Sequence, residues 1–556
     1  MTTATFPAVH RDSTLRFWLP RIALAVLAPI ALLAIVEGAL RLFHVGHETT
    51  LMDSCTVHGT PTMCYNMFFA APFFPPGIIK TPQFFSLAPS KPQNTYRIVI
   101  LGESAAMGDP DFAYGFGRYL EVMLRERFPS TKFEIVNTGM VAINSHVSVI
   151  IARELAGYHP DLFLVYAGSN EVVGPYGPGT VLTNSSMNPA IIRASILARS
   201  SRIGQLLTET GKAPGEWRGM EMFLDRQVRA NSPRMPQAYR NFERNLREIA
   251  QIAHDSGARV LLSTVATNLR DCAPFASLHR EGITPDLLRA WSDLVQRAEA
   301  LEISGSYSDA LKLYLDAAKI DDQYADLQFR IARCYWNLAD YPSAKQRYEL
   351  ARDLDTLRFR ADSRINEVIR NVASNSGQHV QLLDMQSLFG TLSRNGIVGS
   401  ELLYDHVHLT PTASYLLARS AFQQIVTTLP AAANSGHIEP PDQDDCERLL
   451  AFTAHDRARV AAEMVERLQR PPFTGQLNHS EQVQSLLFRS TSTETPQETL
   501  AQYQWAIQRH PGDLALHYKF GFFLFDFNRQ AAAQEFVRAQ PCDGFPVFLP
   551  DGTRVM

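Results

Sequence analysis

Arg97-Ile-Val-Ile-Leu-Gly-Glu-Ser104 is the stretch from which the fold of this chain is predicted. The four consecutive apolar residues Ile98 to Leu101 are typical of a short buried strand, and Gly102 lets the backbone turn sharply where that strand ends. Ser104 is therefore expected at the carboxyl end of a strand. Ligands bind at that edge of parallel α/β sheets, so the hydroxyl can act as a nucleophile if a base reaches it. Ser104 is also a favourable N-cap for a following helix, so its role depends on residues downstream.

Strand and helix signals alternate through the rest of this region. The predicted helices are 117–128, 145–158 and 240–256, and the further strands are 133–136, 162–166, 258–265 and 380–383. Strands separated by helices predict a parallel sheet with helices on both faces. The expected fold class is therefore α/β, with a three-layer α/β/α core.

Three polar segments downstream complete a pattern with Ser104. Asn137-Thr138-Gly139 follows the second predicted strand, Gly168-Ser169-Asn170-Glu171 follows the third, and Asp405-His406-Val407-His408 lies far downstream. In this order the segments resemble the four sequence blocks of the SGNH/GDSL hydrolases, a family of esterases and lipases. The resemblance covers about residues 95–428, apart from an insertion. It implies a flavodoxin-like hydrolase core that acts on an ester substrate with no cofactor and no metal.

The resemblance implies a catalytic triad of Ser104, His408 and Asp405. A serine hydroxyl needs a base to accept its proton, and the base needs a carboxylate to orient it. Asp405 precedes His408 by three residues, about one turn of a helical or turn-like backbone. The Asp-x-x-His spacing selects His408 as the base and leaves His406 as a surface residue or a support for the site.

The resemblance also implies an oxyanion hole made by the backbone N–H groups of Ser104 and Gly139 and the side-chain amide of Asn170. Such donors stabilise the negative charge that develops when an ester carbonyl is attacked. Taken singly, Gly139 and Asn170 are also ordinary turn residues. Glu103 and Glu171 stand where aspartates are frequent in these blocks, so the hydrogen bonds that support the triad are expected to differ.

The amino terminus predicts a membrane anchor. Residues 17–43 are apolar, with a charge-free core at 22–36, and flanking residues extend that core to bilayer length. Arg11, Arg16 and Arg21 precede the core, so the positive-inside rule places residues 1–16 in the cytoplasm and the chain after about residue 44 in the periplasm or outside the cell. A cleaved signal peptide is the alternative, but no clear cleavage site follows the core.

Composition excludes some partners and ligands. The chain has 556 residues, which favours two to four domains, and its net charge of −4 gives no reason to expect a nucleic acid partner. Six cysteines fit an exported protein without requiring disulfides. Cys55 and Cys64 are close enough to close a small loop, whereas pairing of Cys272 with Cys446 would need the fold to bring them together. No Cys/His spacing resembles a zinc site.

A repeat interrupts the α/β pattern at 291–370. Its alanines and aromatic residues recur 34 positions apart, as in Tyr314 with Tyr348 and Ala317 with Ala351, which resembles the period of tetratricopeptide repeats. Residues 358–373 are interpreted as a degenerate third helix pair. A second array is predicted in the tail, after a linker that ends at Pro441 and a helical region at 446–470. The inserted helices are a candidate binding surface for a protein partner, whereas the two repeats of the tail are too few to be stable alone and are expected to dock on this chain itself.

Two segments near the predicted core have no clear period. Residues 44–94 are interpreted as an irregular lead-in, and the long loop at 174–239 as either a lid over the site or a solvated connector. The expected organisation is a cytoplasmic N-terminus (1–16), a transmembrane anchor (17–43), the lead-in (44–94), a hydrolase core in two parts (95–290 and 371–428), a tetratricopeptide insertion (291–370), and a linker with a helical C-terminal region (429–556).

Three classes of function follow from these observations. The first is a membrane-anchored extracytoplasmic esterase that removes acyl groups from a carbohydrate or a small ester. The second is an O-acyltransferase that modifies an exported polysaccharide, since transfer differs from hydrolysis only in the alcohol that takes the acyl group. The third is an interaction scaffold with an inactive hydrolase domain, against which the complete set of Ser, Gly, Asn, Asp and His residues argues.

Overall fold

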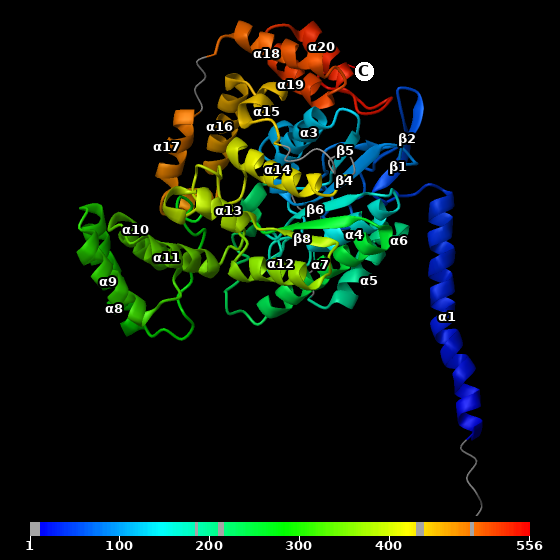
Figure 1. Cartoon of the computed structure of the whole chain (residues 1–556). Helices are drawn as coiled ribbons and strands as arrows, with labels where there is room; N and C mark the ends of the chain where they lie inside the picture. Colours follow the sequence, from blue (N-terminus) through cyan, green and yellow to red (C-terminus); the bar gives the residue numbers. More distant parts are fainter. Residues whose placement is uncertain (1–11, 184–186, 210–215, 430–438, 490–493, 556) are drawn as a thin grey trace, which may run out of the picture.

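A five-stranded parallel sheet forms the centre of the protein (Figure 1). The structure, a computed structural model, describes residues 12–183, 187–209, 216–429, 439–489 and 494–555. The strands are β4 (Thr95–Gly102), β5 (Lys132–Asn137), β6 (Leu162–Tyr166), β7 (Arg259–Ser263) and β8 (Val380–Leu383), in the order β5-β4-β6-β7-β8. Every neighbouring pair is parallel, as predicted. The apolar run Ile98 to Leu101 is completely buried because helices cover both faces of the sheet.

Helices pack on the two faces because the strand order reverses at β4. The connection from β4 to β5 runs in the opposite direction to those from β6 to β7 and from β7 to β8, and right-handed crossovers therefore place their helices on opposite faces. One face carries α3 (Phe116–Arg127) packed on α14 (Pro411–Val426), and the other carries α4 (Ser145–Ala156), α7 (Met235–Ser256) and α12 (Ser363–Asn375). The predicted α/β class with a parallel sheet is confirmed.

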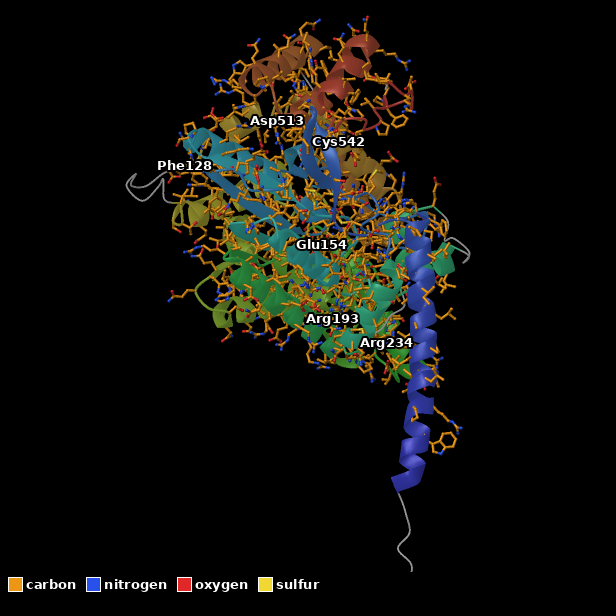
Figure 2. The ribbon with its side chains drawn as sticks, turned by 90° about the vertical axis from the view of Figure 1, so that its right-hand side faces the viewer. Phe128, Glu154, Arg193, Arg234, Asp513 and Cys542 are labelled. Atoms are coloured by element: carbon orange, nitrogen blue, oxygen red, sulfur yellow. A yellow bond between two sulfur atoms is a disulfide. The ribbon has the colours of Figure 1, made fainter. Side chains whose placement is uncertain are left out.

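Helix α1 (Asp12–Leu42) stands apart from the body of the protein (Figures 1 and 2). Its segment Ala23–Leu42 has a mean hydropathy of 2.3 and no buried residues, so it is long and apolar enough to cross a membrane; a signal sequence has the same properties. Most of the predicted cytoplasmic segment, residues 1–11, lies outside the described residues. At its other end α1 contacts α6 (Arg202–Glu209), where Glu37 accepts hydrogen bonds from two backbone N–H groups.

The lead-in at 44–94 is more regular than predicted. Strands β1 (Met52–Val57), β2 (Thr60–Tyr65) and β3 (Ser86–Leu87) form an antiparallel sheet, and a disulfide joins Cys55 to Cys64 across the β1–β2 hairpin. Most residues of this hairpin are polar or only partly buried, so it carries no apolar period to be recognised. Cys272, Cys334, Cys446 and Cys542 are free thiols, and the first three are buried.

The inserted repeat forms two helix pairs, not three. Helices α8 (Pro285–Ile303) and α9 (Tyr307–Ile320) pack together, as do α10 (Ala325–Asn337) and α11 (Tyr341–Leu354), with the recurring alanines and tyrosines buried between them. The predicted third pair at 358–373 is wrong. This segment contains the single helix α12, whose apolar side packs on α7 and the sheet. Asn366 fixes it there by hydrogen bonds to both the N–H and the carbonyl of Val265.

The C-terminal region docks on the core through charged side chains. It contains α15 (Gln443–Leu449), α16 (Ala454–Leu468), α17 (His479–Arg489), α18 (Pro496–Arg509), α19 (Leu514–Phe525) and α20 (Arg529–Arg538), and the helical region expected at 446–470 is made by the end of α15 and by α16. Lys519 and Arg459 both bind Asp111, and Asp513, labelled in Figure 2, binds Arg118. Of the linker predicted at 429–441, residues 430–438 lie outside the described residues.

Candidate active site

Ser104 lies at the carboxyl edge of the sheet, as the first residue of the short helix α2 (Ser104–Met107) that follows β4. Its Oγ lies 2.9 Å from Nε2 of His408, which is 304 residues further along the chain. The loop before α14 brings His408 to this edge. The structure therefore places the predicted nucleophile and the predicted base in direct contact.

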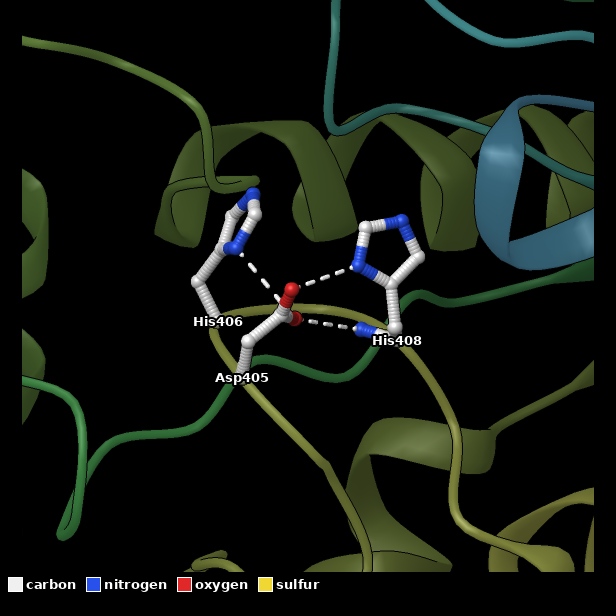
Figure 3. A group of neighbouring side chains, drawn as sticks. All are labelled: Asp405, His406 and His408. Atoms are coloured by element: carbon white, nitrogen blue, oxygen red, sulfur yellow. Dashed lines mark hydrogen bonds and ion pairs between the residues drawn. The ribbon is translucent and has the colours of Figure 1, made fainter. Parts of the chain in front are cut away.

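Asp405 holds His408 on its other side (Figure 3). Asp405 Oδ2 lies 2.7 Å from His408 Nδ1, and Oδ1 accepts the backbone N–H groups of His408 at 3.0 Å and Val407 at 2.9 Å. The Asn268 side chain donates to the Asp405 carbonyl at 3.1 Å. The Asp-x-x-His segment is thus a tight turn whose backbone and side chains both orient the imidazole.

The charges of this site are strongly coupled. Burial disfavours the ionised form of Asp405, but His408 and His406 outweigh burial and hold its pKa well below the usual range. Burial alone would lower the pKa of His408, whereas the carboxylates of Asp405 and Asp109 raise it to about 9. The imidazole is therefore held mostly protonated at neutral pH in this arrangement.

His406 is buried, so its prediction as a surface residue is wrong, while the alternative of a supporting residue agrees with its position. Its Nδ1 lies 3.2 Å from Asp405 Oδ1, and its ring packs edge-on against Phe275, with Phe359 and Phe473 nearby. Burial in this aromatic surrounding is the main cause of its lowered pKa. Asp405 lies between the two imidazoles (Figure 3).

Of the three predicted oxyanion donors, two belong to residues that line the cavity, and the third already has a hydrogen-bond partner. Asn170 and Ser104 line the same cavity. The Gly139 N–H donates to Asn137 Oδ1 at 3.0 Å, so that donor already has a partner. A Cβ at residue 139 would lie 2.4 Å from the backbone nitrogen of Met107, so glycine is required there for close approach to α2.

Glu103 connects the two strand ends that carry Ser104 and Asn170. Its carboxylate accepts backbone N–H groups of Gly168 at 3.1 Å, Ser169 at 2.9 Å and Asn170 at 3.1 Å. Burial and the charge of Glu171 raise the pKa of Glu103 to about 8. The residue that departs from the SGNH pattern thus has a defined structural role.

Glu171 connects the same loop to the start of α4. Its carboxylate accepts the N–H and the Oγ–H of Ser145, each at 2.8 Å. Burial raises the pKa of Glu171 to about 7. Asn245 of α7 donates to the same Ser145 hydroxyl, which ties the loop to both helices on this face.

A cavity of about 490 Å³ opens beside Ser104 and His408. The 217–223 segment of the long loop lines one wall, so this part of the 174–239 loop belongs to the site. The tail lines another wall with residues of α16 and the turn after it. The lining residues include Lys80, Trp217, Met220, Phe223, Phe359, Glu463, Arg467, Arg470 and Phe473. Among the described residues, none of α8 to α11 lines this cavity.

Asp109 and Arg467 were missed by the sequence analysis. Asp109 Oδ2 lies 3.0 Å from His408 Nε2, the atom that also faces Ser104. Arg467 of α16 binds both oxygens of Asp109, at 2.8 and 2.9 Å. Burial opposes the charge of Asp109, but His408 and Arg467 hold its pKa well below the usual range. Neither residue belongs to a recognisable motif, so no local signal marks them.

The described residues contain one group with the composition of a metal site. Donor atoms of Asp405, His406 and His408 lie within 4.8 Å of one another. The Asp405 oxygens already accept hydrogen bonds from His408 and from the backbone, and His408 Nε2 faces Ser104. These donor atoms therefore already have hydrogen-bond partners, and a metal ion would have to displace them.

A second cavity, of about 610 Å³, lies away from Ser104. It is bordered by α4, α5 (Pro189–Ser200), α7 and the end of α1, and its lining includes Glu154 and Arg193, labelled in Figure 2. Arg193 and Arg153 both bind Glu248 at its rim. Ser104 with His408 and this larger cavity are thus on separate parts of the molecule.

No protein-family model matches the chain, and no curated protein matches it. Among solved structures, the crystal structure of an acetyl xylan esterase matches over 59% of this chain and 99% of that chain, with a TM-score of 0.29 and 10% sequence identity. A likeness at this level carries no argument about activity. The functional interpretation therefore depends on the geometry of the site.

Proposed function

We propose that this chain is a serine ester hydrolase of SGNH type, with Ser104 as nucleophile, His408 as general base and Asp405 as the carboxylate that orients His408. The observation that carries the proposal is the continuous set of contacts from Ser104 Oγ to His408 Nε2 at 2.9 Å and from His408 Nδ1 to Asp405 Oδ2 at 2.7 Å. These contacts lie at the wall of a cavity, where a substrate can reach the hydroxyl.

The geometry supports acyl transfer through a covalent intermediate. His408 Nε2 takes the proton of Ser104 as Oγ bonds to the acyl carbon, and then gives the proton to the oxygen of the leaving alcohol as the ester bond breaks. Water then releases the acyl group from Ser104 by the same steps. The Ser104 N–H and the Asn170 side-chain amide are proposed as the oxyanion donors. Gly139 can join them only if its N–H leaves Asn137.

The cavity suits an acylated carbohydrate or a small ester. Trp217, Phe223, Phe359 and Phe473 offer apolar faces, and charged side chains lie among them. Aromatic faces combined with polar groups are typical of sites that bind amphipathic molecules such as sugars. With α1 as a retained anchor, the site would act outside the cytoplasm, as the arginines before the apolar core predict.

An O-acyltransferase is the second candidate. The cavity of about 490 Å³ is much larger than a short acyl group requires, so it has room for an acceptor alcohol as well. The same triad would then pass the acyl group from Ser104 to that alcohol in place of water. We also propose that helices α8 to α11 bind a protein partner, as tetratricopeptide repeats do. These helices do not line the cavity, so a bound partner would leave the cavity accessible to substrate.

Labelling with a fluorophosphonate probe tests the proposal. The full chain, in detergent-solubilised membranes, is expected to react through Ser104, since the probe requires an activated serine. The Ser104→Ala variant should show no labelling and should lose at least about a thousandfold of its ester turnover. Ser292→Ala is the matched control, because Ser292 is exposed on α8, which does not line the cavity. Equal labelling of wild type and Ser104→Ala would overturn the assignment.

A further inference from the structure

Asp109 occupies the side of His408 on which a leaving group must bind. During acylation Nε2 faces Ser104 Oγ first and the oxygen of the leaving alcohol second. Asp109 Oδ2 lies 3.0 Å from this nitrogen, within the same range as the 2.9 Å contact from Ser104. A carboxylate therefore stands where the alcohol oxygen of an ester would have to approach.

Arg467 keeps Asp109 in that place. The guanidinium donates to both carboxylate oxygens, at 2.8 and 2.9 Å, in the paired geometry that makes arginine selective for carboxylates and phosphates. Arg467 lines the cavity, and its side chain is 27% exposed, so a ligand in the cavity can reach it. The Asp109 carboxylate thus occupies the two-pronged hydrogen-bonding edge of Arg467, here called the arginine fork, where the anionic group of a ligand could otherwise bind.

Several charged and titratable groups surround this contact. Asp405 and His406 face His408 from its own segment, and Asp109 faces it from the loop after α2. Arg467 of α16 lies behind Asp109 and interacts with Asp109, Asp405 and Glu463. Glu463, one turn before Arg467, lies 3.4 Å from the guanidinium. Glu463 is thus a weaker partner of Arg467, and the guanidinium would lose both of its short carboxylate contacts if Asp109 moved away.

The C-terminal helices hold the loop that carries Asp109. Asp111 binds Arg459 of α16 and Lys519 of α19, so the same C-terminal helices hold both acidic residues. The closed position of Asp109 is therefore a property of the docked tail, and the tail is part of the active site.

We infer that Asp109 and Arg467 form a latch over the leaving-group side of His408, and that the site takes esters whose alcohol part carries a carboxylate or a phosphate. The inference rests on the proposed function. The anionic group of the substrate would bind Arg467 in place of Asp109, and Asp109 would leave Nε2. An acidic sugar or a phosphorylated alcohol has the required chemistry, whereas a neutral ester leaves the latch closed. The raised pKa of His408 agrees with the closed arrangement.

Two acetate esters of the same framework test the latch. One is 4-acetoxybenzoate, which carries a carboxylate, and the other is its neutral methyl ester. The ratio of kcat/KM for the anionic ester to that for the neutral ester is compared between wild type and each variant, so the intrinsic reactivity of the two esters cancels. Arg467→Gln is expected to lower this ratio by about tenfold or more, because the fork is lost.

In Asp109→Asn the neutral amide no longer pairs with Arg467, so the leaving-group side of His408 should become accessible even when the substrate carries no anion. The kcat/KM of this variant for the neutral ester at pH 7 is expected to rise, and the acid limb of the pH profile should move to lower pH by about one unit or more, since one carboxylate beside His408 is gone. Arg467→Lys keeps the charge but not the fork, so its ratio should lie between those of wild type and Arg467→Gln. Arg448→Gln, an exposed tail arginine paired with Asp445, is the control and should leave the ratio unchanged.

The outcomes separate this inference from the proposed function. An unchanged ratio in Arg467→Gln, or an acid limb in Asp109→Asn that stays in place or moves to higher pH, overturns the latch. If Arg467→Gln does not fold, the latch is tested by the ratio of kcat/KM values in Arg467→Lys and by the pH profile of Asp109→Asn. Ester cleavage that persists in Ser104→Ala would instead contradict the proposed function. Loss of cleavage in Ser104→Ala with an unchanged ratio leaves the hydrolase proposal intact and removes only the latch.

Discussion

The carboxylate of Glu103 accepts the backbone N–H of Asn170 at 3.1 Å, so the residue before the proposed nucleophile holds the residue that presents the proposed oxyanion amide. The two lie at the ends of neighbouring parallel strands, β4 and β6. The same carboxylate takes the N–H groups of Gly168 and Ser169. A glutamate here spans the gap between the strand ends, which makes the distance between Ser104 and Asn170 depend on its length.

Shortening that side chain should therefore slow the chemistry. Glu103→Asp removes one methylene, about 1.5 Å of reach, and is expected to break at least one of the three hydrogen bonds and loosen the loop at 168–170. A loss of roughly 10- to 100-fold in kcat, with little change in KM, is the expected result, as for other residues that orient reacting groups. Steady-state kinetics on a neutral aryl acetate measure it. Wild-type kcat in Glu103→Asp would show that the loop holds Asn170 without this carboxylate.

The two histidines of the 405–408 segment should differ sharply. His408→Ala removes the imidazole that contacts Ser104 and is expected to reduce turnover by about a thousandfold or more. His406→Ala leaves a gap among Phe275, Phe359 and Phe473, so it should lower the thermal midpoint while keeping measurable turnover. Ester hydrolysis and thermal melting of both variants check this. The reverse order of activities would mean that the base is misassigned.

The rate of ester cleavage should rise with pH across the neutral range. His408 accepts the Ser104 proton only when it is neutral, and its pKa is raised to about 9 by Asp405 and Asp109 after burial has opposed them. Below that pKa, kcat/KM for a neutral ester is expected to increase about tenfold for each pH unit, because the neutral fraction does so. A profile measured from pH 6 to pH 10 tests it, and a plateau that begins near pH 6.5 would contradict it.

The inserted helices α8 to α11 should be dispensable for the chemistry. Their two ends lie close together, since Thr356 donates a backbone hydrogen bond to the Ala276 carbonyl at 3.1 Å. Replacement of 278–354 by a short flexible linker is therefore expected to leave a folded protein that hydrolyses a neutral aryl acetate within about threefold of the wild-type kcat/KM, because none of the described residues of these helices lines the cavity.

Stability should fall in the same deletion variant. The packing of Phe329, Ala344 and Tyr348 on Leu269 and Ile397 would be lost, at a cost of several kcal/mol. A thermal melt and a pull-down with the full chain as reference separate the outcomes. Loss of all hydrolysis in a variant that still melts cooperatively would show that the helices shape the site; retained hydrolysis with a lost bound protein would support their role as a partner surface.

The apolar part of α1 should remain in the membrane fraction, with the body of the protein outside the cytoplasm. Three arginines precede the apolar core and one follows it, which predicts this orientation. Protease added to spheroplasts is expected to digest the chain after about residue 44 and to protect an N-terminal tag. A soluble protein whose first residue lies beyond the apolar core would demonstrate cleavage of a signal sequence.

The sequence alone determined the features that depend on neighbouring residues. An apolar run ended by glycine predicted β4 and the place of Ser104, and the Asp-x-x-His spacing predicted the turn that joins Asp405 to His408. The 34-residue period predicted the two inserted helix pairs. Apolar periods and short spacings record local backbone geometry and burial, so they can be recognised without knowing what lies across the fold.

Only the tertiary structure decided which distant side chains share the site. Arg467 meets Asp109 across 358 residues because the C-terminal helices dock beside the loop after α2, and Asp109 in turn contacts His408; no local pattern predicts either contact. His406 is buried by aromatic residues from three separate segments, and the Gly139 N–H is taken by Asn137 because the loop packs on α2. Pairing of charges and exclusion of water depend on how whole elements pack, and that information is spread over the chain and absent from any one segment of it.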